Sequence, residues 1–236
     1  MRLATQCLII CLATAALAQE QAPPILPTWQ DEMAKGIVPY HHLTVDDFPI
    51  NDKAHPKHAY YIKTAVDPHY RFQLRPTQGF VYAYVQHWRV FSGFDKSGTW
   101  RKSAFKQMKA ELPYAQAILD ISEIHARQLA ALKPGELPSG SGATFQEAQA
   151  MLEQNLGQLL SARYKKANDE TAAFVKATDN GRNKKKIREL AAEIRKRLDA
   201  TPAIKIPLSE SAGGLNGTPI AAPQPLITPA PTLVPR

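Results

Sequence analysis

The clearest hydrophobic pattern in the chain lies between residues 111 and 132, in the segment ELPYAQAILDISEIHARQLAAL. One set of positions recurs every three or four residues and consists of Ile118, Ile121, His125, Leu129 and Leu132. This spacing places their side chains on one stripe of an α-helix. Lys133-Pro134-Gly135 follows and is expected to end the helix, because proline cannot continue the helical hydrogen-bond pattern.

Two further helices are expected downstream, after a linker over residues 137–148. Thr144 is a candidate N-cap, and Glu147 three residues later completes a capping box. A long helix is predicted from there to about residue 177, and its inner side consists of Leu152, Leu156, Leu159 and Leu160. Residues 178–181, Thr-Asp-Asn-Gly, are typical of a turn, and a basic helix is predicted beyond them to about residue 198.

The segment before these helices favours β-strands. Residues 58–66, 70–76 and 79–91 are dense in aromatic and β-branched side chains. Turns are expected at Asp67-Pro68 and over residues 76–79. Both faces of the third segment are bulky, so we expect this strand to be covered on both sides. The sequence therefore predicts an α+β fold in which a small antiparallel or mixed sheet is followed by long helices.

The two ends of the chain differ in composition from this central part. Residues 1–18 carry an early arginine, an apolar run too short to cross a bilayer and a small-x-small ending, which is the pattern of a cleaved signal peptide. Residues 19–39 form a Pro-rich segment, expected to be extended over residues 19–30. Residues 201–236 contain eight prolines and no aromatic residue, which predicts a disordered tail. One domain over residues 40–200 remains, with no transmembrane segment and a periplasmic or secreted location.

Composition narrows the chemistry that this domain could use. Both cysteines, Cys7 and Cys11, lie inside the expected signal peptide, so the mature chain has no thiol for a disulfide, a zinc ligand or a nucleophile. The formal charge is +8, with many of the cations in residues 180–198. A basic helix can bind an anionic envelope surface or nucleic acid. The alternative is a solvated helix in which Glu189 and Glu193 alternate with the cations, and export disfavours nucleic acid.

Four short motifs, in order and at matching spacing, resemble a bacterial family of predicted secreted zinc-dependent proteases, catalogued as a domain of unknown function. The motifs are Leu43-Thr44-Val45-Asp46-Asp47-Phe48, Ser97-Gly98-Thr99-Trp100, Tyr114-Ala115-Gln116-Ala117-Ile118-Leu119-Asp120-Ile121-Ser122-Glu123 and Thr178-Asp179-Asn180-Gly181. The resemblance covers about residues 40–198. It implies a zincin-like architecture, in which a helix carrying His-Glu-x-x-His supplies two zinc ligands and the catalytic base, and a later histidine supplies the third ligand.

This chain matches the family at framework positions and differs from it at the positions of the metal ligands and the catalytic base. The matched framework positions are Gln116, Asp120, Ile121, Glu123, Thr178 and Gly181. The four departures are Tyr114, Ala115, Ile118 and Asn180, which stand where the family has His, Glu, His and His. If the resemblance holds, these four positions should converge near one point beside the strand over residues 79–91.

The four replacements remove metal chemistry from the motif. Ile118 has no lone pair, Tyr114 must lose a proton of pKa about 10 before it can bind zinc well, and Asn180 offers a neutral amide oxygen. Ala115 cannot accept the proton of a metal-bound water. The sequence therefore predicts no catalytic residue, no metal and no cofactor at this site. Asp120, which could support the metal in active relatives, could then only brace its helix.

Other histidines and acids are candidates for a relocated site. A metal site among His41, His42, His55 and His58 remains open, against the alternative that these are polar surface residues. His125 is expected to be a core histidine satisfied by one hydrogen bond, and His69 and His87 have no evident partner. Asp46 and Asp47 are neighbours in an expected extended segment, so their side chains should point to opposite sides.

These observations lead to one main interpretation and two alternatives. The main interpretation is an exported, catalytically inactive zincin-like domain that acts by binding a periplasmic or extracellular protein or an anionic envelope surface. A groove of this kind could hold an extended peptide against an edge strand. The first alternative is an active secreted metal-dependent protease whose ligands are displaced. The second is a structural cell-envelope protein that uses its basic helix and Pro-rich tail.

Overall fold

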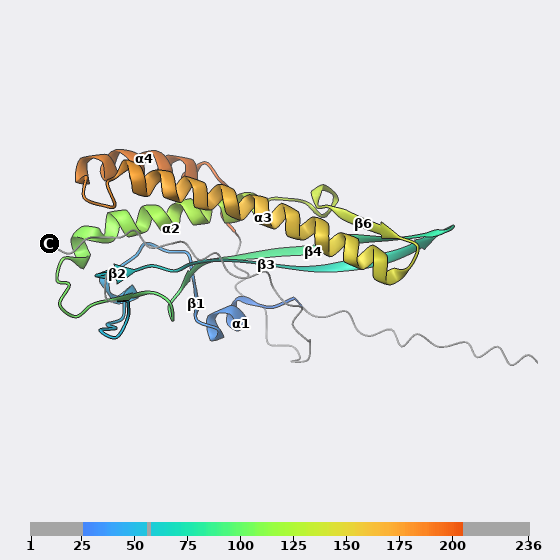
Figure 1. Ribbon diagram of the computed structural model, residues 1–236, viewed down its shortest axis with the longest axis horizontal. Helices are drawn as coiled ribbons and strands as arrows, with labels where there is room; N and C mark the ends of the chain where they lie inside the picture. Colours follow the sequence, from blue (N-terminus) through green and yellow to red (C-terminus); the bar gives the residue numbers. More distant parts are fainter. Residues whose placement is uncertain (1–25, 56–57, 205–236) are drawn as a thin grey trace, which may run out of the picture.

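The computed structural model describes residues 26–55 and 58–204, and it has the α+β fold that the sequence predicts (Figure 1). Three helices, α2 (Met108–Ala130), α3 (Phe145–Ala177) and α4 (Lys184–Asp199), lie over one face of a small antiparallel sheet. The expected signal peptide, with both cysteines, lies outside the described residues, as does nearly all of the expected tail. Within the part of the chain that is described, no helix is both long and apolar enough to span a bilayer.

The centre of the sheet is a long hairpin formed by β3 (Thr64–Thr77) and β4 (Phe80–Asp95). The turn expected near residues 76–79 is present, and Gly79 there has φ +82°, a conformation that glycine adopts without strain. The turn expected at Asp67-Pro68 is wrong, because β3 runs straight through it. Proline is tolerated there because β3 is an edge strand and needs no N–H donor on its open side.

Two short strands pair with the other edge of β4. β1 (Ile37–Pro39) pairs with the end of β4, and β6 (Ser139–Gly142) pairs with its beginning. The expected linker over residues 137–148 therefore contains a strand. Its glycines are needed because α3 packs closely on β6: a Cβ at Gly140 would lie 2.2 Å from the carbonyl oxygen of Ala148. β2 (Tyr60–Tyr61) and β5 (Trp100–Arg101) form a separate two-stranded sheet.

The helices begin and end close to their expected positions. The Thr144–Glu147 capping box is confirmed at the start of α3, where each side chain accepts a hydrogen bond from the other residue's backbone N–H. Three short 3₁₀ or α elements complete the fold, namely α1 (Trp29–Ala34), η1 (Val45–Asp47) and η2 (Pro134–Glu136). Because η1 is helical, the extended conformation expected for Asp46-Asp47 is wrong.

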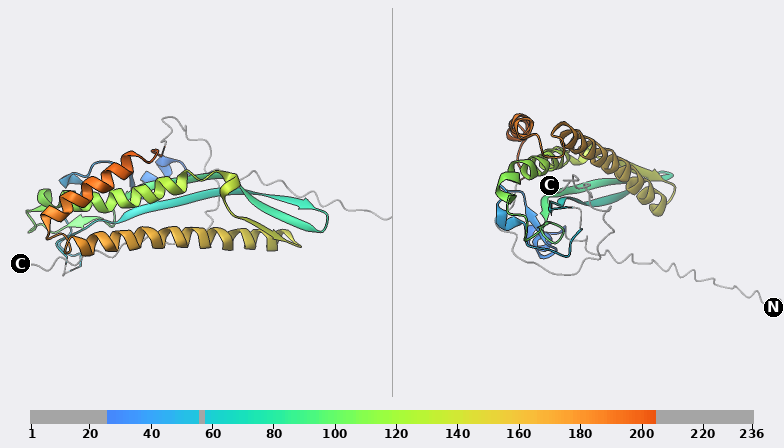
Figure 2. Two further views of the ribbon diagram at one scale, coloured as in Figure 1. Left: turned by 90° about the horizontal axis from the view of Figure 1, so that it is seen from above. Right: turned by 60° about the vertical axis from the view of Figure 1, so that its left-hand side comes forward.

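α1 lies on the face of the sheet opposite to α2, α3 and α4 (Figures 1 and 2). Thr28 and Asp31 form a capping box at its start, and Trp29 is buried with its ring edge-on to Phe91 of β4. The folded part of the chain thus begins before residue 40. The extended conformation expected over residues 19–30 is wrong for Trp29 and Gln30, which belong to α1, and residues 19–25 lie outside the described residues. The sequence does not indicate this helix clearly, because the proline-rich composition around α1 favours an open chain.

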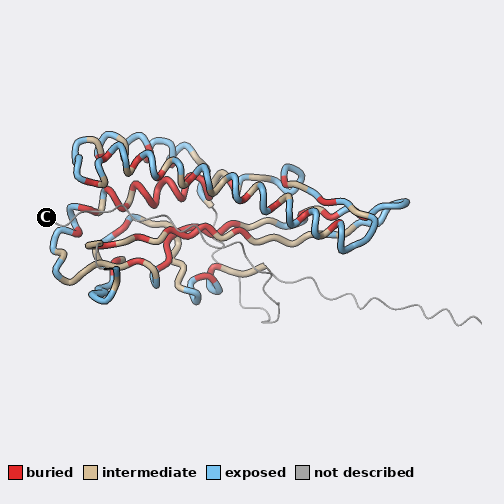
Figure 3. The backbone as a smooth tube through the Cα atoms, viewed as in Figure 1, coloured by how far each residue is buried: buried red, intermediate tan, exposed pale blue. Residues whose placement is uncertain are grey.

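The core lies between the sheet and the three long helices (Figure 3). Near the tip of the hairpin only one face of β4 is buried, where Val81, Ala83 and Val85 pack under α3. Phe80 and Tyr82 on the other face are 57% and 46% exposed. The expectation that both faces of this strand are covered is therefore wrong at the tip, because α1 reaches only the base of the hairpin (Figure 1).

Candidate functional site

Three of the four positions expected to have lost the zinc chemistry are buried on α2. Tyr114, Ala115 and Ile118 are 1%, 0% and 2% exposed and belong to one apolar cluster. The same cluster includes Phe174 from the last turn of α3 and Ile187 of α4. The helix face that carries metal ligands in the family that the sequence resembles is here a hydrophobic contact between helices.

A small polar group borders Tyr114. Glu111, one turn earlier on α2, accepts a hydrogen bond from the Lys184 ammonium at the first residue of α4. Burial raises the pKa of Tyr114, and the negative charge of Glu111 raises it further. The pKa of Tyr60 is raised by burial and by the same carboxylate. Tyr114 therefore stays a neutral phenol, which is a poor metal ligand.

The fourth position, Asn180, lies in the turn between α3 and α4. Asp179, Asn180 and Gly181 have φ values of 50°, 53° and 86°, which is the left-handed conformation that Gly and Asn adopt most readily. The backbone N–H of Asn180 donates to the Val175 carbonyl and closes the end of α3. The expected turn is confirmed. The elements on both sides of it contact the cluster around Tyr114, while convergence of Asn180 itself stays a prediction.

Two framework residues of α2, Gln116 and Asp120, hold the chain segment before η1. The Gln116 Oε1 accepts a hydrogen bond of 2.7 Å from the Leu43 backbone N–H, and its Nε2 donates to Asp120 Oδ1 at 2.7 Å. The Tyr40 hydroxyl also donates to Asp120 Oδ1, at 2.8 Å. Arg195 of α4 donates to the Tyr40 hydroxyl at 2.9 Å. Asp120 thus joins three segments, which agrees with the bracing role expected for it.

The remaining framework residues also make structural contacts. Thr178 is fully buried, and its hydroxyl donates to the Phe174 carbonyl at 2.8 Å. Glu123 on α2 accepts a hydrogen bond from the Ser92 hydroxyl of β4 and another, of 2.7 Å, from Arg127 Nε. Burial raises the pKa of Glu123, and the two donors oppose that change. Since both carboxylate oxygens of Glu123 are engaged, this residue cannot readily accept a proton from a substrate.

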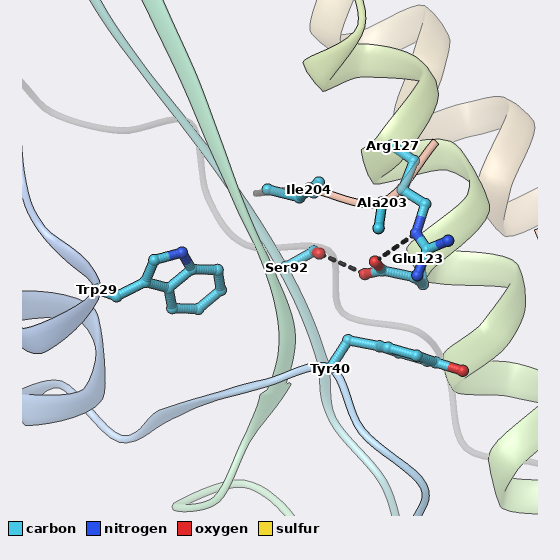
Figure 4. Close-up of a pocket in the computed structure, with 7 residues that line it drawn as sticks. All are labelled: Trp29, Tyr40, Ser92, Glu123, Arg127, Ala203 and Ile204. Carbon is cyan, nitrogen blue, oxygen red and sulfur yellow. Dashed lines mark hydrogen bonds and ion pairs between the residues drawn. The ribbon is translucent and has the colours of Figure 1, made fainter. Parts of the chain in front are cut away.

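Glu123 lines a cavity of about 150 Å³ between the sheet and the end of α2 (Figure 4). The cavity is bounded by Trp29, Tyr40, Ser92, Glu123, Arg127, Ala203 and Ile204. The Arg127 guanidinium lies 5.6 Å from the centre of the Tyr40 ring and donates to the carbonyls of Leu198 and Thr201. These contacts use the polar groups of the cavity to attach the end of α4 to α2. The cavity therefore offers little chemistry to a ligand.

The four histidines considered for a relocated metal site are held in other ways. His41 contacts Asp47 Oδ1 at 3.1 Å and the Pro39 carbonyl at 2.9 Å. His42 Nε2 accepts a hydrogen bond of 2.8 Å from the Arg195 guanidinium. The rings of His55 and His58 lie 4.7 Å apart. Within the described ranges these residues do not form a group of three metal-ligating side chains.

The other titratable residues singled out in the sequence have separate roles. His125 is buried, and its Nε2 lies 2.9 Å from Glu170 Oε2 on α3, so the expected core histidine with one partner is confirmed. The Asp47 carboxylate caps η1 by accepting from Thr44, whereas Asp46 is exposed. His87 is exposed on β4.

One group of metal-ligating side chains was not predicted from the sequence. Glu32 of α1 lies beside Asp67 and His69 of β3, and their ligand atoms all lie within 4.8 Å of one another. Asp67 and His69 are two residues apart on a strand, and this spacing places both on one face. The Asp-x-His pattern was the available signal, but the expected turn at Asp67-Pro68 concealed it. The approach of Glu32 depends on tertiary structure alone.

The basic helix α4 is amphipathic. Ile187, Ile194 and Leu198 are buried against α2, and several cations on the outer side face carboxylates. The pairs in the structure are Lys184–Glu111, Lys186–Glu189, Arg195–Asp120 and Arg197–Glu170. The Lys186–Glu189 pair is of the kind expected for a solvated helix in which glutamates alternate with cations. Several cations of α4 therefore form ion pairs that attach this helix to α2 and α3.

Comparison with known proteins gave no match to any family model, curated protein or solved structure. The similarity to zinc-dependent proteases therefore rests on the four motifs of the sequence, and the function must be argued from this chain's own geometry.

Proposed function

We propose that this chain is an exported, catalytically inactive relative of zincin-like proteases and that it acts by binding an acidic protein partner. The observation that carries the binding role is the exposed face of the β3–β4 hairpin, here called the arm face. It consists of the exposed residues Arg75, Phe80 and Tyr82 and the half-buried Arg71 and Tyr84 beside them. The buried, apolar state of Tyr114, Ala115 and Ile118 supports the absence of zinc-dependent hydrolysis.

The arm face follows from the register of the hairpin. Arg75 pairs with Tyr82 and Gln73 pairs with Tyr84, so these side chains lie on one side of the sheet. The opposite side, with Val81, Ala83 and Val85, is covered by α3. The hairpin tip extends beyond α1, and the arm face is therefore open to solvent (Figures 1 and 3).

The composition of the arm face suits recognition of a protein. Exposed aromatic residues are unusual on a surface, and aromatic residues and arginine are enriched at protein interfaces and among their strongest contacts. Aromatic rings on a strand are rigid and lose little side-chain entropy on binding. An extended peptide added along the edge of β3 is less favourable, because Pro68 and Pro76 interrupt its donors.

The charge of the arm predicts the sign of the partner. Residues 68–94 contain Arg71, Arg75 and Arg89 and not one aspartate or glutamate. Such a surface attracts an acidic partner and repels a basic one. The partner is therefore expected to present carboxylates around an apolar centre that receives the rings of Phe80 and Tyr82.

Site-directed photo-crosslinking in the source cells tests this proposal. A photoreactive phenylalanine analogue at Tyr82 should give a discrete adduct with one acidic protein, and the same analogue at Glu189 on α4 should not. R71Q/R75Q should abolish the adduct, whereas K185Q/R188Q, which removes two exposed charges from α4, should preserve it. The purified partner should bind more weakly as the salt concentration rises.

Three results would contradict the proposal. The first is the same crosslinking pattern from Tyr82 and Glu189. The second is binding to a defined anionic polymer such as heparin that K185Q/R188Q removes and R71Q/R75Q preserves, which would favour the structural envelope protein. The third is chelator-sensitive cleavage of casein by the purified protein, which would favour the active protease with displaced ligands.

A further inference from the structure

We propose that Glu32, Asp67 and His69 form a binding site for one divalent transition-metal ion, with Zn²⁺ as the suitable probe. The site lies between α1 and the sheet, on the face opposite to α2, and it is independent of the binding role proposed above. The lost zinc chemistry of the protease motif concerned Tyr114, Ala115, Ile118 and Asn180, none of which takes part here.

The geometry of the three side chains fits a small metal ion. His69 Nε2 lies 3.0 Å from Asp67 Oδ2 and 3.6 Å from Glu32 Oε1. Ligand atoms at about 2.0–2.2 Å from a zinc ion are separated by roughly 3.0–3.5 Å from one another. One imidazole and two carboxylates suit Zn²⁺ and similar ions, and a water molecule can complete the coordination because His69 and Asp67 remain 20% and 26% exposed.

Two buried polar atoms of this group have no hydrogen-bond partner. The side chain of Glu32 is completely buried, and no N–H group of the described residues donates a hydrogen bond to its Oε2. The Asp67 carboxylate lies within hydrogen-bonding reach of Glu32, so two acidic groups face each other here. Nε2 of His69 also makes no hydrogen bond with any described residue, and its approach to Asp67 is an ion-pair contact without hydrogen-bond geometry. A buried carboxylate without a full set of partners is costly, and a metal ion bound by both carboxylate oxygens of Glu32 and by His69 Nε2 would satisfy both orphaned atoms. This independent observation distinguishes the group from an ordinary acidic cluster.

Two cations adjoin the site. The ammonium of Lys35, the C-cap residue of α1, donates to Glu32 Oε1 at 2.6 Å, and the side chain of Lys35 is 56% exposed. It can therefore move into solvent when a metal ion takes its place. Arg89, the cross-strand neighbour of His69, donates to the Pro27 carbonyl at 2.9 Å. Because it occupies Glu32 Oε1, Lys35 is an internal competitor of the metal ion.

Calorimetric titration of the tag-free protein with Zn²⁺ tests the site, and Co²⁺ absorption in the visible range reports the ligands. One equivalent should bind. E32Q, D67N and H69A should each weaken binding by at least about 10-fold, because changes even outside the ligand set cost that much. K35M should strengthen binding, since it removes the competing ammonium. H87A, which removes an exposed histidine from the same hairpin, is the matched control and should bind like wild type.

Two results would contradict the proposed metal site. Wild type and K35M that both bind no Zn²⁺ would show that the cluster is an ion-pair group satisfied by Lys35. Binding that E32Q and H69A leave unchanged, or that H87A weakens equally, would assign the ion to surface histidines. Because E32Q keeps the size of the side chain, its circular dichroism and melting temperature separate lost binding from lost folding.

Discussion

The ring of Tyr114 on α2 stacks on the ring of Phe174 at the end of α3, with centroids 5.3 Å apart and planes at 30°. This contact puts a hydrophobic junction between two helices at the position where the resembled family has its first zinc ligand. A residue that would have to face an open metal site is instead 1% exposed. Because of this junction, the role of Tyr114 can be tested through stability as well as through activity.

Truncation of Tyr114 should separate the roles of its ring and its hydroxyl. Y114A should destabilise the protein by about 3–5 kcal/mol, the range for removing a buried aromatic side chain. Y114F should change stability by less than about 1 kcal/mol, because the buried hydroxyl approaches Thr178 but makes no hydrogen bond of good geometry with the described residues. Urea unfolding followed by circular dichroism measures both. A large loss in Y114F would mean that the hydroxyl has a partner.

Restoring the four family residues should create a zinc site. In Y114H/A115E/I118H/N180H we expect one tightly held zinc ion after dialysis, because Gln116, Asp120 and Thr178 keep their framework contacts. The new polar side chains enter an apolar cluster, so folding should require the metal ion and a chelator should unfold the variant.

The matched control for this restoration is the triple variant that retains Ile118. It lacks one ligand and should hold zinc at least about 10-fold more weakly. Elemental analysis and melting curves with and without chelator give the readout. A quadruple variant that folds but holds no zinc after dialysis would show that the scaffold does not bring these four positions together, and the zincin-like assignment would fail.

Loss of the Asp120 carboxylate should free the segment before η1. D120A leaves the Tyr40 hydroxyl and the Gln116 amide without their shared acceptor, at a cost of roughly 2–4 kcal/mol. Amide hydrogen exchange at Leu43 should become faster, since Gln116 would no longer be held in place for that backbone N–H. D46A, at an exposed position of the same motif, should leave exchange at Leu43 unchanged. Equal protection in D120A and wild type would refute the bracing role.

Acid should weaken the contact between α2, α3 and α4 at Glu170. Burial opposes ionisation of Glu170, but hydrogen bonds from His125 and Arg197 outweigh it and hold the pKa at about 2, below the ordinary value of 4.5. The unfolded chain thus takes up the proton first as the pH falls. The stabilisation is complete above about pH 4.5 and disappears towards pH 2.

E170Q should remove the part of the pH dependence that arises from this residue. Free energies of unfolding measured at intervals between pH 2 and pH 6 should fall less steeply in E170Q than in wild type, with a difference of roughly 1–3 kcal/mol at pH 6 that vanishes near pH 2. D169N, at the exposed neighbouring residue, should follow the wild-type curve. Parallel curves for E170Q and wild type would rule out this coupling.

The sequence by itself determined the elements whose signals are local. The stripe through Ile118 and Leu129 predicted α2, and the Thr144–Glu147 box predicted the start of α3, because helical spacing and caps depend on neighbours within one or two turns. The turn at Asn180 followed from the preference of Asn and Gly for left-handed backbone. Because these signals are local, the order of strands and helices, and with it the α+β class, could be predicted from the sequence.

Tertiary structure alone decided what local composition concealed. Gly140 lies in a segment with the composition of a linker, yet it pairs with β4 because α3 packs on that strand and leaves no room for a side chain. Pro68 signals a turn, yet it continues an edge strand that needs no donor there. Glu32 and His69 are far apart in the sequence and meet only because α1 folds back onto the sheet. Contacts of this kind depend on which surfaces the core brings together, and no short segment of the sequence encodes that choice.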